Sequence, residues 1–247
     1  MNAPVTVDLW ILEEPAVLAA SLTASLESML DDREKARYRR FARTEDKQRF
    51  LLNRSFVRQV LAGYTDTSPV SLQICTSTFG KPLLVQGEQE ELIHFNLSHT
   101  RGWAALAVCR QAEVGVDIEL LDRNPDMEGL ARRYFSVQEV TDLMELEAAD
   151  RCRRFFALWT AKEAFLKAIG LGLRIPLNSF SVFFSGQHPA IFRHGAETGN
   201  QFVCCRHWFM AERCSLALVA CVDPVQEIIV NFNEWSPDDN PLVSQLM

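Results

Sequence analysis

Apolar and polar residues alternate along this chain with the periods of both strands and helices. A strand-like pattern runs from Val5 to Leu12, and residues 21–62 then have the periodicity of helices. An apolar stripe at helical spacing is made by Leu51, Leu52, Phe56, Val60 and Leu61. Gly63, which follows the stripe, is a typical helix stop. The first quarter of the chain is therefore predicted to be a strand followed by helices.

The rest of the chain repeats one plan. Strand-like segments occur at Val70–Cys75, Leu92–Leu97, Trp103–Cys109 and Glu113–Glu119. Helical patterns follow at about 136–148 and 151–169, and further strand patterns occur near 178–184, 201–210 and 214–222. We predict an α+β fold, a pseudo-dimer of two similar α+β halves, residues 1–120 and 121–247, connected by the loop Leu120–Gly129. Polar ligands would bind in the crevice between the halves.

Composition is that of an ordinary globular protein. Of 247 residues, 48% are hydrophobic and 23% are charged. The first twelve residues lack the features of a secretory signal, and no stretch approaches the ~18 apolar residues of a membrane span. Seven cysteines, an odd number without CxxC spacing, are typical of reduced thiols. We therefore expect a cytoplasmic protein with no membrane contact, acting as a monomer.

Charge is distributed unevenly. The net charge is −7, yet residues 33–58 contain ten basic residues against three acidic ones. A solvated helix face is one interpretation of this stretch. Nucleic acid is a weaker one, because the rest of the chain is acidic and no nucleic-acid-binding motif accompanies the stretch. A small polyphosphate ligand fits better.

Two acidic motifs carry the chemistry. In Gly115-Val116-Asp117-Ile118-Glu119 the residues alternate, so on a strand both carboxylates project from one face. Two like charges there repel each other, and a hard cation would relieve the repulsion, although half-exposed strands also carry such acids. In the helical pattern Trp159–Lys167, Glu163 and Lys167 are neighbours at a spacing of four. Glu163 can complete an all-oxygen metal site, which favours Mg²⁺ over zinc, and Lys167 can meet a phosphate.

Lys162 is an anomaly in the same helix. It falls near the centre of the apolar face formed by Phe155, Leu158, Phe165 and Ile169. A lysine there is costly unless it reaches solvent or has an anionic partner. We interpret Lys162 as a further residue that binds the ligand, while a surface ion pair between Glu163 and Lys167 is the plainer alternative for this helix.

Other motifs are less specific. Lys81 follows Gly80 in a turn, but Cys75 and Pro82 exclude a Walker phosphate loop. Ser98 and His99 end a strand, and no GxSxG motif supports a serine hydrolase. His99 could hydrogen-bond a phosphate. The cysteines near His207 fit no common zinc spacing.

Together these residues resemble the surfactin-synthetase-activating type of 4′-phosphopantetheinyl transferase. The resemblance runs along nearly the whole chain. It is carried by Arg39-Arg40-Phe41, Phe79-Gly80-Lys81-Pro82, Phe95–His99, Gly115–Glu119, Tyr134–Glu139 and Trp159–Lys167 with Gly170-Leu171-Gly172. The order of these motifs is specific, although no single one is.

The resemblance implies transfer of the phosphopantetheine arm of coenzyme A to a serine of an acyl, peptidyl or aryl carrier protein. It implies that Asp117, Glu119 and Glu163 hold Mg²⁺, with Mn²⁺ as an alternative, that Glu163 accepts the serine proton, and that Lys167 stabilises the departing phosphate. Nucleotide phosphates would be bound by Arg37, Arg49, Lys81, Ser98 and His99. Glu34 stands where the family often has a lysine, so Arg33 or Lys35 would substitute for it. The carrier would dock on residues 121–134 and 170–180.

Two other functions stay open. A non-catalytic relative would keep coenzyme A binding and act as a binding module. A Mg²⁺-dependent phosphohydrolase would use the same acids with water as nucleophile. The chain offers no convincing nucleophile of its own, which favours phosphoryl transfer to a hydroxyl of the substrate.

Overall fold

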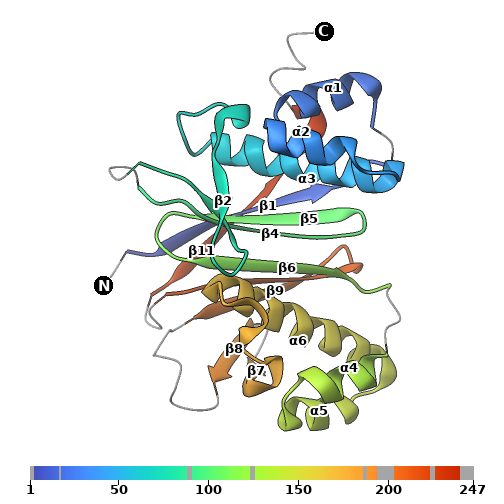
Figure 1. The fold of residues 1–247 in the computed structure, drawn as a ribbon. Coiled ribbons are helices and arrows are strands. Elements are labelled where there is room, and N and C mark those ends of the chain that lie inside the picture. Colours follow the sequence, from blue (N-terminus) through green and yellow to red (C-terminus); the bar gives the residue numbers. More distant parts are fainter. Residues whose placement is uncertain are drawn as a thin grey trace.

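The computed structural model describes residues 3–16, 18–87, 91–122, 126–185, 188–193, 203–222 and 226–239. These residues form four stacked layers (Figure 1). The outer layer is made of three helices, α1 (Ala20–Ser28), α2 (Asp32–Arg39) and α3 (Thr44–Ala62). Helix α6 (Ala148–Ile169) covers the opposite side, and two β-sheets lie between these helices.

The first sheet has the strand order β11-β1-β5-β4. Its strands are β1 (Val5–Glu13), β4 (His94–Thr100), β5 (Trp103–Cys109) and β11 (Ile228–Glu234). Strand β11 is parallel to β1, and the other pairs are antiparallel. The second sheet is antiparallel, with the order β6-β10-β9 and the strands β6 (Val114–Leu120), β9 (Cys204–Met210) and β10 (Cys214–Ala220).

Smaller elements complete the two halves. Beside α6 lie α4 (Met127–Tyr134), α5 (Val137–Met144) and the hairpin β7 (Phe180–Ser185) and β8 (His188–Arg193). A short hairpin, β2 (Ile74–Thr76) and β3 (Pro82–Leu84), precedes β4. Short 3₁₀ turns are formed by Pro69–Ser71, Gly172–Arg174, Leu177–Ser179 and Pro237–Asp239.

Three apolar cores hold the layers together. One lies between α1–α3 and the first sheet, one between the two sheets, and one between the second sheet and α4–α6. The central strands β5 and β10 are buried along their whole length, because each is covered on both faces. Burial of such apolar surface is the main favourable contribution to folding.

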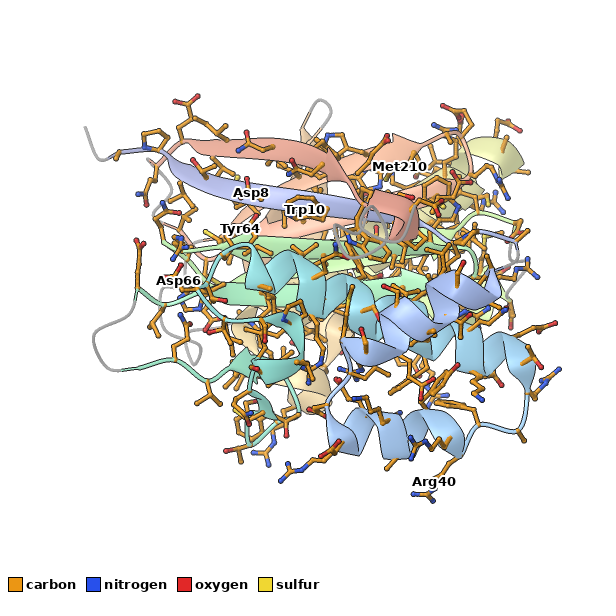
Figure 2. The ribbon with its side chains drawn as sticks, turned by 90° about the horizontal axis from the view of Figure 1, so that it is seen from above. Asp8, Trp10, Arg40, Tyr64, Asp66 and Met210 are labelled. Atoms are coloured by element: carbon orange, nitrogen blue, oxygen red, sulfur yellow. The ribbon has the colours of Figure 1, made fainter. Side chains whose placement is uncertain are left out.

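A polar contact fastens the end of α3 to the first sheet. Tyr64, just after α3, donates from its hydroxyl to Asp8 Oδ2 at 2.6 Å and accepts from Trp10 Nε1 at 3.0 Å. Figure 2 shows these three residues close together beside β1. Burial and the hydrogen bond to Asp8 raise the pKa of Tyr64, so the hydroxyl stays protonated and can donate.

The α+β class and the arrangement in two similar halves are confirmed. Each half has a sheet covered by one long helix, α3 or α6, and each contains a hairpin whose later strand is fully buried, β4–β5 or β9–β10. The proposed boundary at residue 120 is crossed by two strands, however. Strand β6 pairs with the sheet of the second half, and β11 returns to the sheet of the first.

Several elements differ from their predictions. Residues 127–134, which were placed partly in a connecting loop, form helix α4; Asp126 caps it by accepting from Gly129 N at 2.9 Å. The predicted strand 70–75 is a 3₁₀ turn followed by the short strand β2. Strands β3, β8 and β11 were not predicted. Residues 123–125, 201 and 202, which fall in predicted elements, lie outside the described part of the chain.

Candidate active site

The two halves meet where β4 runs beside β6. Side chains of β4 join the strands: Asn96 Oδ1 accepts from Val116 N at 2.9 Å, and Ser98 Oγ accepts from Ile118 N at 3.4 Å. The Ser98 hydroxyl donates to Asp117 Oδ1 at 2.8 Å. Residues of the first half therefore orient the acidic strand that pairs with the second.

Helix α6 lies very close to this strand. A Cβ atom on Gly115 would come within 2.1 Å of the carbonyl oxygen of Ala164 and 2.3 Å of the nitrogen of Ala168. Only glycine permits this backbone approach. The contact places Glu163 and Lys167, which directly precede Ala164 and Ala168 on the helix, beside the carboxylates of β6. The glycine that opens the Gly115–Glu119 motif thus sets the distance between the two acidic motifs.

Lys167 occupies the centre of this junction. Its ammonium group donates to Asp117 Oδ1 at 2.6 Å, Ser98 Oγ at 2.9 Å and the carbonyl oxygen of Val116 at 3.1 Å. The side chain of Lys167 keeps 28% of its surface exposed, whereas that of Asp117 keeps 7%. The side chain of Lys167 is thus anchored at its ammonium group and remains partly exposed.

Three carboxylates gather around Lys167. Asp117 and Glu119 alternate with the buried Val116 and Ile118, as predicted, so they share one face of β6. Burial raises the pKa of Glu163, the negative charges of Asp117 and Glu119 raise it further, and Lys167 opposes them. The three acids are therefore close enough to repel one another.

This donor set fits a hard divalent cation. Asp117 Oδ2 is buried and has no hydrogen-bond partner among the described residues, although its sister oxygen has two. An oxygen-only set of carboxylates with one unpartnered oxygen suits Mg²⁺ or Mn²⁺. Within the described residues, no three His, Cys, Asp or Glu side chains are already arranged as a closed metal site. A cation would therefore require Glu163 and Glu119 to turn towards Asp117.

A cluster of cations flanks the carboxylates at the end of β4. Although His99 is exposed, neighbouring protein removes part of its hydration and lowers its pKa, and the positive charges of Arg49, Lys167 and Arg54 lower it further. Arg49 has two long contacts with acids: its Nε lies 3.5 Å from Glu14, and its guanidinium lies 3.9 Å from Asp46 Oδ1. The cluster is thus a place where an anion is favoured.

Arg54 belongs to this cluster and was not predicted as a site residue. It lies 5.6 Å from the ring centroid of Phe50, and Arg37 lies 5.2 Å from the same centroid. In the sequence, Phe50 and Arg54 are four residues apart in a predicted helix. This spacing brings an arginine over an aromatic ring and could have indicated the role of Arg54. Arg37 is exposed at the edge of this group.

Not every basic residue of the stretch 33–58 is available to a ligand. Arg58 is fully buried and is held by Asp31 Oδ2 at 2.6 Å and Glu34 Oε2 at 2.5 Å. Glu34 also closes the capping box of α2 with Asp31. The departure from the family pattern at Glu34 thus has a structural cause, because this acid neutralises a buried arginine.

Lys162 is a correction to the predicted site. Its ammonium group is fully buried, 2.9 Å from Glu139 Oε2, and donates to the carbonyl oxygens of Leu177 at 2.8 Å and Phe180 at 2.6 Å. These contacts use its three protons within the protein. Lys162 therefore joins α6 to α5 and β7, and it cannot contact a ligand in the crevice.

Lys81 is placed in the crevice, but its charge is already paired. Its ammonium group donates to Glu113 Oε2 at 2.5 Å and to the carbonyl oxygens of Ala168 and Val114. Hydrogen bonding by His94 and Lys81 lowers the pKa of Glu113 to about 2, so this carboxylate is ionised. The part of Lys81 that remains available to a ligand is its apolar stem and its backbone.

A cavity of about 260 Å³ opens beside these groups. It lies between the β2–β3 turn, β4 and the end of α6, and its wall includes Phe79, Gly80, Leu97, Glu163, Lys167 and Gly170. Arg174 stacks over Phe79 at 4.4 Å from the ring centroid. The cavity thus connects an apolar wall from the first half with the acid and lysine of α6.

The remaining predictions concern the surroundings of the site. All seven cysteines are free thiols, and no helix among the described residues is long and apolar enough to cross a bilayer. In the two segments predicted for carrier docking, Met127 and Leu171 are half-buried; the side chain of Leu173 is outside the described set.

Comparisons with known proteins identify the family of this chain. Residues 113–217 match the model of the 4′-phosphopantetheinyl transferase superfamily, and residues 19–111 match that of the N-terminal part of 4′-phosphopantetheinyl transferase. The chain is 35% identical over 222 residues to slr0495 of Synechocystis sp., which has a provisional assignment as a 4′-phosphopantetheinyl transferase; the match covers 85% of this chain and 87% of the relative.

Further relatives carry the same name. The 4′-phosphopantetheinyl transferase HetI of Nostoc sp. is 36% identical over 66% of this chain and 67% of its own. Sfp of Bacillus subtilis is 34% identical over 63% of this chain and 66% of its own. A solved holo-[acyl-carrier-protein] synthase from Neisseria meningitidis superposes on 45% of this chain and 98% of its own, with a TM-score of 0.40 and 22% identity. The chain therefore belongs to the 4′-phosphopantetheinyl transferase superfamily.

Proposed function

We propose that this protein transfers the 4′-phosphopantetheine arm of coenzyme A to a serine of an apo carrier protein, with release of adenosine 3′,5′-bisphosphate. The observation that supports this most directly is the junction of β4, β6 and α6. There three carboxylates, one half-exposed lysine and a cluster of cations adjoin one cavity. Because one chain supplies both sides of the crevice, the enzyme is complete as a monomer.

Coenzyme A is bound along the crevice. The cavity beside Phe79 and Gly80 receives the nucleotide, and Arg49, Arg54 and His99 bind its phosphates at the cationic end. Arg37 extends this positive surface from α2. Ser98 acts through Asp117 and Lys167, whose positions it fixes by hydrogen bonds.

Asp117, Glu119 and Glu163 would hold the divalent cation, which supplies charge neutralisation at the pyrophosphate. The serine hydroxyl of the carrier attacks the phosphorus that bears the pantetheine arm, and the bond from that phosphorus to the bridging oxygen of the nucleotide breaks. Glu163, at the mouth of the cavity, accepts the serine proton. Lys167 stays beside the departing phosphate, since its exposed side faces the crevice.

A single assay distinguishes this function from the two alternatives. The protein is incubated with coenzyme A, Mg²⁺ and an apo carrier protein, and the mass of the carrier is measured. A gain equal to the arm supports transfer. Coenzyme A binding without a gain in mass would support the binding module, and cleavage of coenzyme A without carrier would support the hydrolase. A panel of acyl, peptidyl and aryl carriers then identifies the class served.

The metal is tested in the same assay. Removal of divalent cations with EDTA is expected to stop transfer, and Mg²⁺ or Mn²⁺ added back is expected to restore it. Full activity in the presence of EDTA would contradict the cation assignment while leaving the transferase assignment intact.

A further inference from the structure

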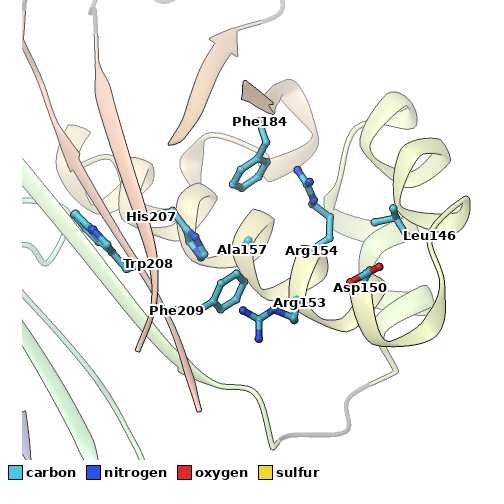
Figure 3. Close-up of a pocket in the computed structure, with 9 residues that line it drawn as sticks. All are labelled: Leu146, Asp150, Arg153, Arg154, Ala157, Phe184, His207, Trp208 and Phe209. Atoms are coloured by element: carbon cyan, nitrogen blue, oxygen red, sulfur yellow. The ribbon is translucent and has the colours of Figure 1, made fainter. Parts of the chain in front are cut away.

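A second cavity, of about 620 Å³, lies at the other end of α6, away from the catalytic junction (Figure 3). It is enclosed by the first half of α6, the strand β9 and the end of β7. None of the residues proposed above for catalysis or for coenzyme A lines it. In the second sheet, Ala217 of β10 pairs with Asp117 of β6 on one side and with His207 of β9 on the other. Asp117 and His207 therefore lie on the same face of the sheet, and two strand spacings, roughly 10 Å, separate them. The two sites thus lie on opposite edges of one sheet.

The walls of this cavity carry two arginines held by aromatic rings. The guanidinium of Arg153 lies 4.0 Å from the ring centroid of Phe209, and that of Arg154 lies 4.3 Å from the centroid of Phe184. In Figure 3 both guanidinium groups lie against these rings. Stacking restricts the arginine side chains and leaves their N–H edges able to bind an anion.

Arg154 is the cation of this cavity that has no ion pair among the described residues. Arg153 forms an ion pair with Glu212, whereas Arg154 has no hydrogen bond or ion pair with any residue in the described part of the chain. Asp150 lines the same cavity but pairs with neither arginine among those residues; it lies in the first turn of α6, where the helix dipole stabilises it.

Arg154 also borders a smaller cavity, of about 250 Å³, which contains two acids. Both acids are engaged elsewhere: Glu139 with Lys162, and Asp142 as the acceptor of a hydrogen bond from Gln138 Nε2 at 2.7 Å. Among the described residues Arg154 thus has no ion pair, although the chain as a whole carries a net charge of −7.

The third feature is a row of rings. His207 lies 6.0 Å from Phe184 and 4.6 Å from Phe209 between ring centroids, with interplanar angles of 86° and 79°. A polar chain holds the imidazole in place, because His207 Nε2 lies 2.9 Å from Ser215 Oγ, which lies 3.0 Å from Thr160 Oγ1. An aromatic ring entering the cavity would continue this edge-to-face arrangement.

We propose that this cavity binds a small aromatic carboxylate. Its carboxylate pairs with the guanidinium of Arg154, and its ring packs against Phe184, His207 and Phe209. The volume lies within the range of small-molecule sites.

The test uses the intact protein with 1-naphthoate as the probe, measured by isothermal titration calorimetry. The expected result is saturable binding of one probe per chain, at least ~10-fold weaker in Arg154→Gln, because a charged hydrogen bond is lost. The matched control is Arg110→Gln, which changes a half-exposed arginine paired with Glu91 and leaves binding unchanged. Melting temperature and basal transferase activity confirm that both variants are folded.

Two measurements on the wild-type protein make the test independent of any variant. The uncharged amide, 1-naphthamide, is expected to bind at least ~10-fold more weakly than the acid. Saturating coenzyme A is expected not to displace 1-naphthoate, because its cavity is separate. Absence of saturable binding, equal binding of acid and amide, equal binding by Arg154→Gln, or displacement by coenzyme A would each overturn the proposal.

Discussion

Helix α6 carries two lysine–carboxylate pairs with opposite surroundings. Lys162 and its partner Glu139 keep 0% and 2% of their side-chain surface exposed, whereas Lys167 keeps 28% beside the buried Asp117. In both pairs the ammonium group has three protein acceptors. In the second, one carboxylate oxygen is left without a partner among the described residues, and the lysine opens to the crevice. The fully buried pair stabilises the fold, whereas the partly exposed pair is available to a substrate.

The largest effect should come from breaking the buried pair Lys162–Glu139. We expect Lys162→Met to lower the free energy of unfolding by roughly 3–5 kcal/mol, because Glu139 is left charged and buried. Adding Glu139→Gln should recover part of this loss. Denaturant unfolding of the single and double variants measures both values. If Lys162→Met instead lost coenzyme A affinity with unchanged stability, Lys162 would be a ligand-binding residue and not part of the buried core.

A change at the catalytic junction should reduce transfer activity. Glu163→Gln keeps the shape and helix propensity of the residue but removes a charge and a proton acceptor. We expect transfer to slow by at least ~100-fold, the usual scale of a general base, with a smaller loss of coenzyme A binding. Steady-state kinetics and calorimetry separate the two effects. Equal losses of rate and binding would indicate a role in the ground state only.

Lys167→Met sharpens the contrast with Lys162→Met on the same helix. We expect a large fall in kcat and a cost in stability of about 1 kcal/mol, because solvent reaches this pair. Unfolding and transfer assays on the two lysine variants give the comparison directly. A loss of stability as large as that of Lys162→Met, with turnover retained, would assign Lys167 to structure.

The cation cluster should show intermediate effects. Arg54→Ala and Arg49→Ala are each expected to weaken coenzyme A binding by roughly 1–3 kcal/mol, the range for hydrogen bonds to charged groups. Dephospho-coenzyme A, which lacks the 3′-phosphate, is the control ligand. A residue that contacts this phosphate has a penalty with coenzyme A and almost none with the control. Equal penalties with both ligands would remove the residue from the 3′-phosphate site.

The smallest effect concerns Lys81 and Glu113, a pair of intermediate exposure. Because His94 and Lys81 lower the pKa of Glu113 to about 2, its contribution to stability is complete above the unfolded value near 4.5 and is lost as pH falls towards 2. Glu113 is 43% exposed, so this contribution is at most about 1 kcal/mol. The stability difference between wild type and Glu113→Gln should shrink below pH 4.5. A constant difference down to pH 2 would refute the contribution.

Local patterns predicted the elements whose signals lie within one segment. The alternation around Asp117 predicted that Asp117 and Glu119 share one face of a strand. The spacing of Glu163 and Lys167 predicted that these two residues are neighbours on a helix. The pattern also marked Lys162 as a lysine that needs an anion. It could not identify that anion, because Glu139 reaches Lys162 from a separate helix and the covering carbonyls come from residues 177 and 180.

Elements with distant partners were harder to predict. Strand β11 has apolar residues at its start, but its partner β1 lies at the other end of the chain. Helix α4 was missed because its polar surface resembles a loop, although Asp126 before it and the Glu128–Arg132 pair within it are helix signals. Arg54 was not assigned because its role depends on how α3 packs near the end of β4.

The return of β11 to β1 has a consequence for how the chain acquires its structure. During synthesis β1 emerges first, yet its parallel neighbour is completed only at Glu234. Until then one edge of β1 keeps its backbone donors and acceptors unpaired, and such an edge is prone to wrong pairing. Nearly the whole second half must therefore be translated before the first sheet is complete. The two halves thus form one folding unit despite their internal similarity.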